Sequence, residues 1–203
     1  MEKEDEKEKQ QAELDAKRNN EQKVKRWSKK CSWLLRHGAV QEGLSMDAAG
    51  WVSVGDLQEH LSLNQSDLEL VLTQNNKARF EVNDGLIRAC QGHSLKSMPV
   101  TKEALEASWS IYNGSDSIWH GTHRGALEAI KREGIICGER SHVHLARSVH
   151  SRVGKRSNVS IFIEVSCAYL RQAGYEVFES TNGVILTRYV PLNCIVNISS
   201  FKA

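Results

Sequence analysis

The sequence predicts an α+β fold of two lobes that follow a charged leader. Residues 27–98 carry three segments with helical periodicity and then a strand, turn and strand, whereas residues 99–203 carry short strands that alternate with short helices. A chain of 203 residues with 40% hydrophobic content can bury one medium core or two small ones. The change of pattern near Pro99 places the joint between the lobes.

The leader, residues 1–26, holds eight acidic and eight basic side chains and no aromatic residue. Such a segment cannot build a hydrophobic core, so it forms either a solvated helix with Glu and Lys pairs at helical spacing or a disordered arm. We favour the solvated helix, frayed and without a chemical role, and expect the fold to begin near Trp27.

Three helices are expected in the first lobe. Apolar residues recur every three or four positions between Trp27 and His37, and Gly38 ends this helix. Two further helices are expected at residues 56–60 and 64–75, the second capped by Asn64 with an aspartate three positions later.

A β-hairpin follows these helices. Residues 79–82 and 86–89 read as strands, and the turn between them is Asn83-Asp84-Gly85. Three helices followed by a two-stranded hairpin predict a winged-helix lobe.

The second lobe is expected to mix short strands with short helices, without an internal repeat. In chain order these elements are a strand ending at Ile118-Trp119-His120, a helix over residues 124–132, a strand around His142, a strand over 160–165, a helix over 168–172, and strands near Val177, over 184–186 and over 195–198.

Composition excludes several classes of protein. No apolar stretch approaches the roughly 20 residues that cross a bilayer, and the N-terminus lacks the apolar block of a signal peptide. The five cysteines lie far apart without a Cys-x-x-Cys pair, which argues against a disulfide framework and a thiolate zinc site. We therefore expect a monomer inside the cell, in the cytoplasm or the nucleus, with no membrane partner. The net charge of +2 indicates nothing about nucleic acid by itself.

The run of residues 138–145 carries the first candidate site. In a strand, Arg140, His142 and His144 would share one face, with apolar residues on the other. The cations either form a solvated strand edge or face an anion. A metal site built on the two histidines lacks a third ligand at a suitable spacing, so no metal is expected.

A second candidate is His120-Gly121-Thr122, which comes after a strand and before a helix. Its backbone N–H groups and the threonine hydroxyl can face a ligand that approaches the glycine closely. A turn with a satisfied histidine is the alternative.

Seven blocks of sequence resemble the NAD⁺-dependent RNA 2′-phosphotransferases, in the right order and at compatible spacing over residues 27–198. The blocks are residues 35–38, 47–52, 77–80, 87–94, 120–122, 138–145 and 182–187. The set is highly specific and covers nearly everything except the leader.

The resemblance implies a winged-helix RNA-binding lobe at residues 27–98 and an ADP-ribosyltransferase-like lobe at residues 99–203 that binds NAD⁺. The reaction it implies removes the internal 2′-phosphate that ligation leaves in spliced tRNA. The phosphate attacks the nicotinamide ribose of NAD⁺ and releases nicotinamide; the 2″-hydroxyl of that ribose then attacks phosphorus, which yields 2′-OH RNA and ADP-ribose 1″,2″-cyclic phosphate.

The resemblance also implies the site residues. The family's catalytic set maps onto Arg36, His37, Arg79 and Arg140. The NAD⁺ contacts map onto His120, Gly121, Thr122, His144, Asn182 and Gly183.

The chemistry of this reaction suits those four residue types. A phosphate is already a nucleophile and nicotinamide leaves as a neutral amide, so the first step needs guanidinium groups that orient the phosphate rather than the paired carboxylates of a glycosidase. The second step removes a proton from an alcohol, for which a histidine is suited. His37 either transfers this proton or only donates a hydrogen bond to the phosphate.

Simpler interpretations remain for some of these residues. Arg36 and His37 could complement a helix dipole, and Arg79 could be a strand-edge cation. His93, His123, His142, His150 and Arg88 are expected to be structural or peripheral. The chain also departs from the family's usual residues in having Ala146 in place of serine and His150 in place of glycine.

Two other functions fit the same motifs in part. An ADP-ribosyltransferase would stop after the first step and modify a terminal phosphate of a nucleic acid, but retention of all four basic residues favours the complete reaction. A winged-helix RNA-binding protein without activity would not need residues 120–122 and 182–183 intact.

Overall fold

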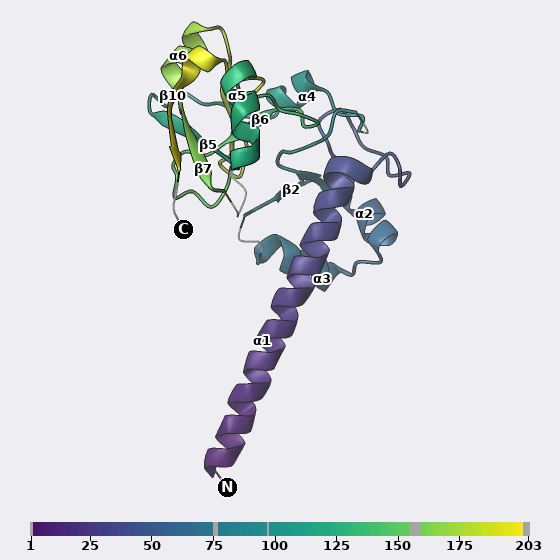
Figure 1. The fold of residues 1–203 in the computed structure, drawn as a ribbon. Helices are drawn as coiled ribbons and strands as arrows, with labels where there is room; N and C mark the ends of the chain where they lie inside the picture. The colour runs from purple at the N-terminus through teal and green to yellow at the C-terminus, as the bar shows by residue number, and fades with distance from the viewer. Residues whose placement is uncertain (1, 75–76, 97, 155–158, 201–203) are drawn as a thin grey trace.

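The structure is a computed structural model that describes residues 2–74, 77–96, 98–154 and 159–200. It mixes helices and short antiparallel strands, as expected of an α+β protein. A long N-terminal helix extends away from the rest of the molecule (Figure 1).

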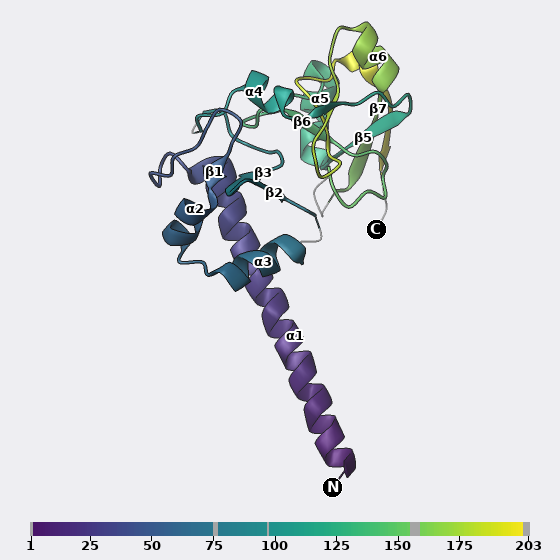
Figure 2. The same ribbon diagram turned by 180° about the vertical axis from the view of Figure 1, so that it is seen from behind.

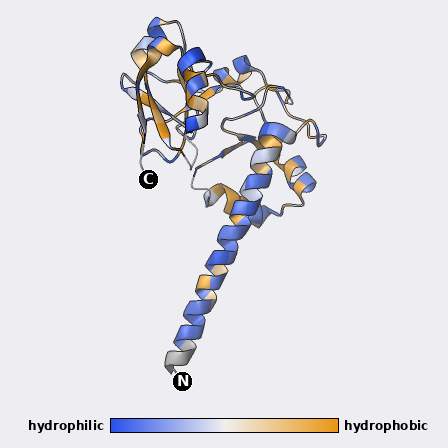
Figure 3. Cartoon of the chain, viewed as in Figure 1, coloured by the Kyte–Doolittle hydropathy of each residue, from blue (hydrophilic) through white to orange (hydrophobic). Residues whose placement is uncertain are grey.

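That helix, α1, runs from Glu2 to Trp33 and continues into a π-helical turn, η1 (Leu34–Gly38). The prediction of a separate helix beginning at Trp27 is therefore wrong. The leader contains neither glycine nor proline, and its lysines and glutamates favour the helix, so nothing interrupts it. Figure 3 shows the extended part as mostly hydrophilic.

Contact with the core begins within the leader, a few residues before Trp27. Val24 is buried, and the Lys23 ammonium lies 2.5 Å from a carboxylate oxygen of Asp67 on α3 (Gln65–Thr73). The last turns of α1 are thereby fixed against the N-terminal half.

The other elements of the N-terminal half follow the predicted order. Helix α2 (Val54–Leu61) precedes α3, whose first turn is capped as predicted: the side chain of Asn64 accepts a hydrogen bond from the Asp67 backbone N–H at 2.8 Å. The predicted end of this helix at Asn75 lies outside the described residues.

The predicted hairpin is confirmed as β2 (Phe80–Asn83) and β3 (Leu86–Ala89), paired antiparallel. Asp84 and Gly85 have φ of 47° and 76°, which are the left-handed conformations of a tight hairpin turn. A strand too short to be predicted, β1 (Val52–Ser53), pairs with β3 and gives the order β1-β3-β2.

The second half contains two antiparallel sheets, with strand orders β10-β7-β5 and β4-β8-β9-β6. The predicted strands appear as β5 (Ser117–Thr122), β6 (Val143–Leu145), β7 (Ile161–Ser166), β8 (Phe178–Glu179), β9 (Ile185–Thr187) and β10 (Ile195–Ser200). The predicted helices appear as the 3₁₀ turn η2 (Arg124–Ala126) with α5 (Leu127–Glu133), and as α6 (Cys167–Gln172). Three elements were not predicted: α4 (Lys102–Ala107), β4 (Ser110–Ile111) and the 3₁₀ turn η3 (Leu192–Cys194).

Two hydrophobic clusters form the core. One contains Trp27 and most apolar residues of the N-terminal half, and it also takes in Trp109, Phe178 and Leu186 from later in the chain. The other surrounds β5 and β7. The four-stranded sheet therefore packs against the N-terminal half, and β6 lies between that half and the β5–β7 pair (Figure 2).

None of the helices in the described part of the chain combines the length and the apolar character that a membrane crossing requires.

Candidate active site

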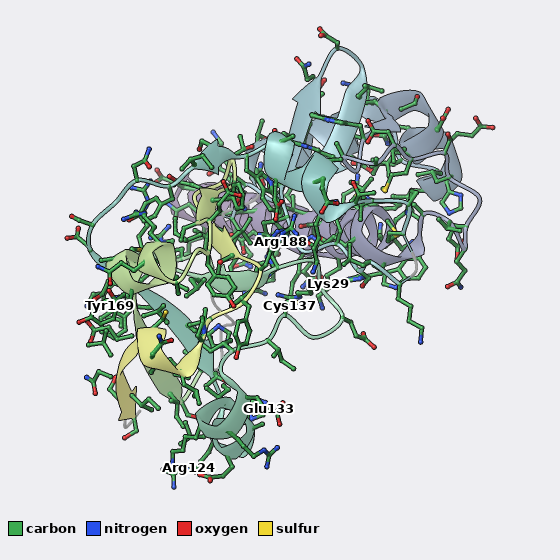
Figure 4. The ribbon with its side chains drawn as sticks, turned by 90° about the horizontal axis from the view of Figure 1, so that it is seen from above. Lys29, Arg124, Glu133, Cys137, Tyr169 and Arg188 are labelled. Atoms are coloured by element: carbon green, nitrogen blue, oxygen red, sulfur yellow. The ribbon has the colours of Figure 1, made fainter. Side chains whose placement is uncertain are left out.

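A cleft of about 660 Å³ lies between the two halves and is lined by residues of both. All the predicted site residues except Gly183 line it. Those from the N-terminal half are Arg36, His37 and Arg79, and those from the second half are His120, Gly121, Thr122, Arg140, His144 and Asn182. Figure 4 shows the cleft residue Cys137 toward the N-terminal half and Tyr169 of α6 on the outer side.

The π-helical turn at the end of α1 presents Arg36 and His37 to the cleft. A side chain at the next position would have to displace the Trp33 indole, because a Cβ atom on Gly38 would lie 2.6 Å from that ring. Turns of this kind occur often at functional sites. The end of α1 therefore places both side chains in the cleft.

Arg36 lies among other cations. Burial, followed by the charges of Arg140 and Arg79, lowers the pKa of its guanidinium to about 10. Its buried Nε has no hydrogen-bond partner among the described residues. The guanidinium is still charged at neutral pH. An anion would offset its repulsion by the other arginines and would accept a hydrogen bond from Nε.

His37 lies beside this cluster. Its Nδ1 is 2.7 Å from the hydroxyl oxygen of Ser94, whose backbone N–H donates to the Arg36 carbonyl at 2.9 Å. Burial, then the charges of Arg36 and Arg140, lower the pKa of His37 below 6.5. The imidazole is therefore mainly neutral at neutral pH, as a proton acceptor must be.

Arg140 is placed by contacts that the strand prediction did not include. Strand β6 begins only at Val143, so Arg140 lies in the preceding turn, where its backbone forms a β-bridge with Ser94. Arg140 is therefore not in the strand whose alternation was expected to place it on one face with His142 and His144. Arg140 nevertheless meets His144, because its Nη1 is 3.4 Å from Nδ1 of that imidazole.

His144 is held from both sides. Its Nε2 is 2.9 Å from Oε1 of Gln91. A guanidinium can only donate, so Nδ1 accepts from Arg140 and Nε2–H donates to Gln91. Burial and the charges of Arg140 and Arg36 keep the pKa of His144 well below 6.5. A neutral His144 thus orients Arg140 as well as lining the cleft.

His142 lines the cleft, but its side chain binds partners outside this cluster. Its ring is buried, Nε2 lies 2.8 Å from Oε1 of Glu106, and the ring meets Trp109 edge-on at 4.9 Å between centroids. The prediction that Arg140, His142 and His144 share one strand face is therefore wrong. The structural role expected of His142 agrees with these contacts. No group of three metal-ligating side chains occurs within the described ranges.

The motif of residues 120–122 belongs to strand β5 rather than to a turn after it, since Gly121 pairs with Phe162 and Thr122 with Ile161 of β7. Nδ1 of His120 donates to the carbonyl oxygen of His144 at 3.0 Å, which ties β5 to β6. The expected turn is thus a strand edge along one wall of the cleft.

Asn182 and Gly183 have different positions. The Asn182 amide donates to the carbonyl of Lys77 at 3.0 Å and accepts from the Ser180 hydroxyl at 2.9 Å, so it joins the second half to the segment that leads into Arg79. Gly183 does not line the cleft; its φ of 78° and its hydrogen bond to the Ser180 carbonyl form the turn before β9. A direct ligand contact by Gly183 is not supported.

Gln91 and Ser94 were missed by the prediction, although both lie in a sequence block that resembles the family. Gly92 between them has φ of 93°, and a Cβ atom there would lie 3.4 Å from Nε of Arg36. A glycine shortly after a strand and between polar residues was the available sign of a close approach. This short segment positions Arg36, His37 and His144 together.

The two departures from the family lie outside the cationic cluster. Ala146 is buried and exchanges backbone hydrogen bonds with Trp119, and it does not line the cleft. His150 is exposed, and its backbone N–H donates to the Ser148 hydroxyl.

Comparison with known proteins gives a consistent result. The model of the RNA 2′-phosphotransferase, Tpt1 / KptA family matches residues 21–189. The chain is 34% identical over 175 residues to a probable RNA 2′-phosphotransferase of Burkholderia lata, which covers 82% of this chain and 87% of the relative. It is 32% identical over 182 residues to one of Pseudomonas syringae pv. tomato (85% and 93%) and 31% identical over 187 residues to one of Acaryochloris marina (88% and 99%). The chain therefore belongs to the RNA 2′-phosphotransferase, Tpt1 / KptA family.

Proposed function

We propose that this protein removes an internal 2′-phosphate from RNA by transferring it to NAD⁺, with release of nicotinamide and ADP-ribose 1″,2″-cyclic phosphate, and that spliced tRNA is the substrate. One observation carries the proposal within this family. Arg36 is a half-buried guanidinium that the charges of Arg79 and Arg140 repel, and it lines a cleft of about 660 Å³.

The cleft suits NAD⁺ in size and character. Its volume of about 660 Å³ falls within the range of cofactor sites. Apolar side chains such as Ile130 and Val184 line it together with the polar Thr122. NAD⁺ combines flat ring systems with charged phosphates, so we propose that it binds along β5 and α5 and directs its nicotinamide ribose toward the arginines.

The arginines would bind the RNA 2′-phosphate. Guanidinium groups donate paired hydrogen bonds to phosphate oxygens and stabilise charge that develops in the transition state. The carboxylates that border the cleft, Glu133 and Glu139, are exposed, and Glu133 is bound to Arg132. The cluster around Arg36 is thus suited to orienting a phosphate, not to the acid and base work of a glycosidase.

His37 would take the proton in the second step. Its lowered pKa leaves the imidazole neutral, and Ser94 fixes the orientation of the ring through Nδ1. A bound phosphate dianion would oppose the effect of the arginines and raise the pKa, which would help His37 to keep the proton it accepts.

The architecture supports the same proposal. Helices α1 to α3 with the β1-β3-β2 sheet have the composition of a winged helix, and we propose that this half binds RNA while the second half is ADP-ribosyltransferase-like.

The test uses a short RNA with one internal 2′-phosphate, incubated with the protein in the presence and absence of NAD⁺ and followed by mass spectrometry. We expect loss of the phosphate only with NAD⁺, together with one nicotinamide released per phosphate. Matched RNA with a 2′-hydroxyl should release no nicotinamide. Retention of the phosphate would overturn the proposal, and RNA that keeps both its phosphate and an added ADP-ribose would indicate an ADP-ribosyltransferase.

A further inference from the structure

A second hollow, which we call the α1 groove, joins the cleft. It has a volume of about 740 Å³ and shares Arg36, His37 and Arg79 with the cleft. Residues of α1 from Glu21 to Trp33 form much of its wall, so the wall includes one carboxylate beside the lysines, and Gln74 after α3 also lines the groove. The residues of α1 that the argument uses are Lys25, Ser28, Lys29 and Trp33.

The lysines of the α1 groove differ in their contacts from the other lysines in this part of α1. Lys23 is paired with Asp67, and Lys30 lies 4.8 Å from the centre of the Trp27 ring. Lys25 and Lys29, by contrast, are exposed, and no carboxylate of the described residues lies within ion-pair distance of either. They are four positions apart, which places them about 6 Å apart along the helix axis.

Lys25 and Lys29 lead along α1 to the cluster around Arg36, which we propose binds the 2′-phosphate. Ser28 lies between the two lysines in sequence, and its hydroxyl is 3.5 Å from Nη1 of Arg79. Trp33 is 45% exposed and lies one turn before His37, with its ring against Gly38. The α1 groove therefore offers successive cations and then an aromatic face, the combination with which proteins bind single-stranded nucleic acid.

We propose that the α1 groove binds the sugar-phosphate backbone of the RNA strand next to the 2′-phosphate. Lys25 and Lys29 contact successive backbone phosphates, and Trp33 stacks on the base nearest the reaction site. The inference rests on the proposed function for its orientation, because the strand must enter where its 2′-phosphate reaches Arg36. It adds a binding surface outside the reaction cleft, and this surface increases the affinity for a longer RNA.

The experiment compares two RNAs, a 2′-phosphorylated dinucleotide and a longer single strand with the same phosphate at its centre. Binding of fluorescent forms is measured by anisotropy without NAD⁺ over a series of salt concentrations, and KM is measured with NAD⁺. The test variant is Lys25→Ala/Lys29→Ala. The matched control is Lys7→Ala/Lys9→Ala, which removes the same charge from an exposed part of the same helix.

We expect the unaltered protein to bind the longer RNA more tightly than the dinucleotide. The test variant should lose about tenfold in affinity for the longer RNA, so that the advantage of length largely disappears. Its salt slope should become shallower by about 1.4, because two phosphate contacts to a single strand are lost. The control should retain both the advantage and the slope.

Equal affinity and equal salt slope for the test variant and the unaltered protein would overturn the α1 groove as an RNA site. This result is independent of catalysis. If the length advantage depends on the two lysines but NAD⁺ removes no phosphate, the groove stands and the proposed function fails.

Discussion

Two clusters in this molecule contain arginine and histidine side chains and have opposite electrostatic environments. In the cleft, Arg36 lies near Arg79 and Arg140, and its pKa is lowered to about 10. Directly after β9, Arg188 forms two hydrogen bonds of 2.6 Å with the Glu106 carboxylate, and the pKa of Arg188 is raised. The difference is the charge of the neighbours: carboxylates of the protein satisfy Arg188 in the second cluster, whereas other arginines act on Arg36 in the first.

The clusters are also neighbours in sequence. His142 binds Glu106 in the satisfied cluster, whereas His144, two residues later, binds Arg140 in the cleft. The satisfied cluster thereby fixes the start of β6, the strand that carries His144. We infer that the first cluster serves function and the second serves stability, and the following predictions test that division.

The largest effect on kcat is expected from replacing Arg36 of the first cluster with alanine, compared with the same change at Arg188 of the second. Arg36→Ala should lower kcat by roughly 10²–10³-fold, because it removes a guanidinium that stabilises transition-state charge. Arg188→Ala should change kcat by less than tenfold, because Arg188 faces carboxylates of the protein. Steady-state kinetics on the phosphorylated RNA measures both, and similar losses would contradict the division.

The next effect is on stability. Glu106→Gln removes the charge shared by His142 and Arg188 and should lower the free energy of unfolding by about 1–3 kcal/mol in urea titrations. Activity per folded molecule should remain within a few fold. Glu103→Gln is the matched control, since this carboxylate is exposed and binds only the outer side of Arg188; an equal loss from the control would show that Glu106 has no special role.

The third effect is a pH dependence of stability from His93, a buried histidine behind Arg36. Burial, then the charges of Arg36 and Arg88, lower its pKa from 6.5 to about 3. The unfolded chain therefore takes up this proton first as pH falls, so the stabilisation is complete above pH 6.5 and is lost toward pH 3, at up to about 1.4 kcal/mol per pH unit.

His93→Gln, which cannot take up the proton, should show a shallower loss of unfolding free energy between these pH values. The lowered pKa values of His142 and His144 act in the same direction, so part of the slope remains in the variant. An unchanged slope would show that His93 does not cause it.

The smallest effect is expected from Ser94, which orients His37. Ser94→Ala removes one hydrogen bond and should lower kcat by about two- to tenfold. Ser141→Ala is the control, because this nearby serine is also buried and its hydroxyl has no hydrogen-bond partner in the described structure. An unchanged kcat in Ser94→Ala would show that the hydrogen bond from Ser94 is not needed to orient His37.

The sequence alone determined the local features of this protein. The Asn64 cap, the Asn83-Asp84-Gly85 turn and the order of most helices and strands follow from patterns within a few residues. The cap, the turn and the element order depend on neighbours along the chain, which a sequence displays directly. The proposed roles of the arginines and of His37 rest instead on the resemblance of seven sequence blocks to the family.

Only the tertiary structure separated His142 from His144, removed Gly183 from the cleft and showed that Gln91 and Ser94 hold the site together. The partners responsible are distant in sequence: Glu106 is 36 residues from His142, Gln91 is 53 from His144, and Ser94 is 57 from His37. Very short strands such as β1 and β4 likewise exist only because a remote strand pairs with them. The charge state and orientation of a side chain depend on what folding places around it, and no local pattern contains that information.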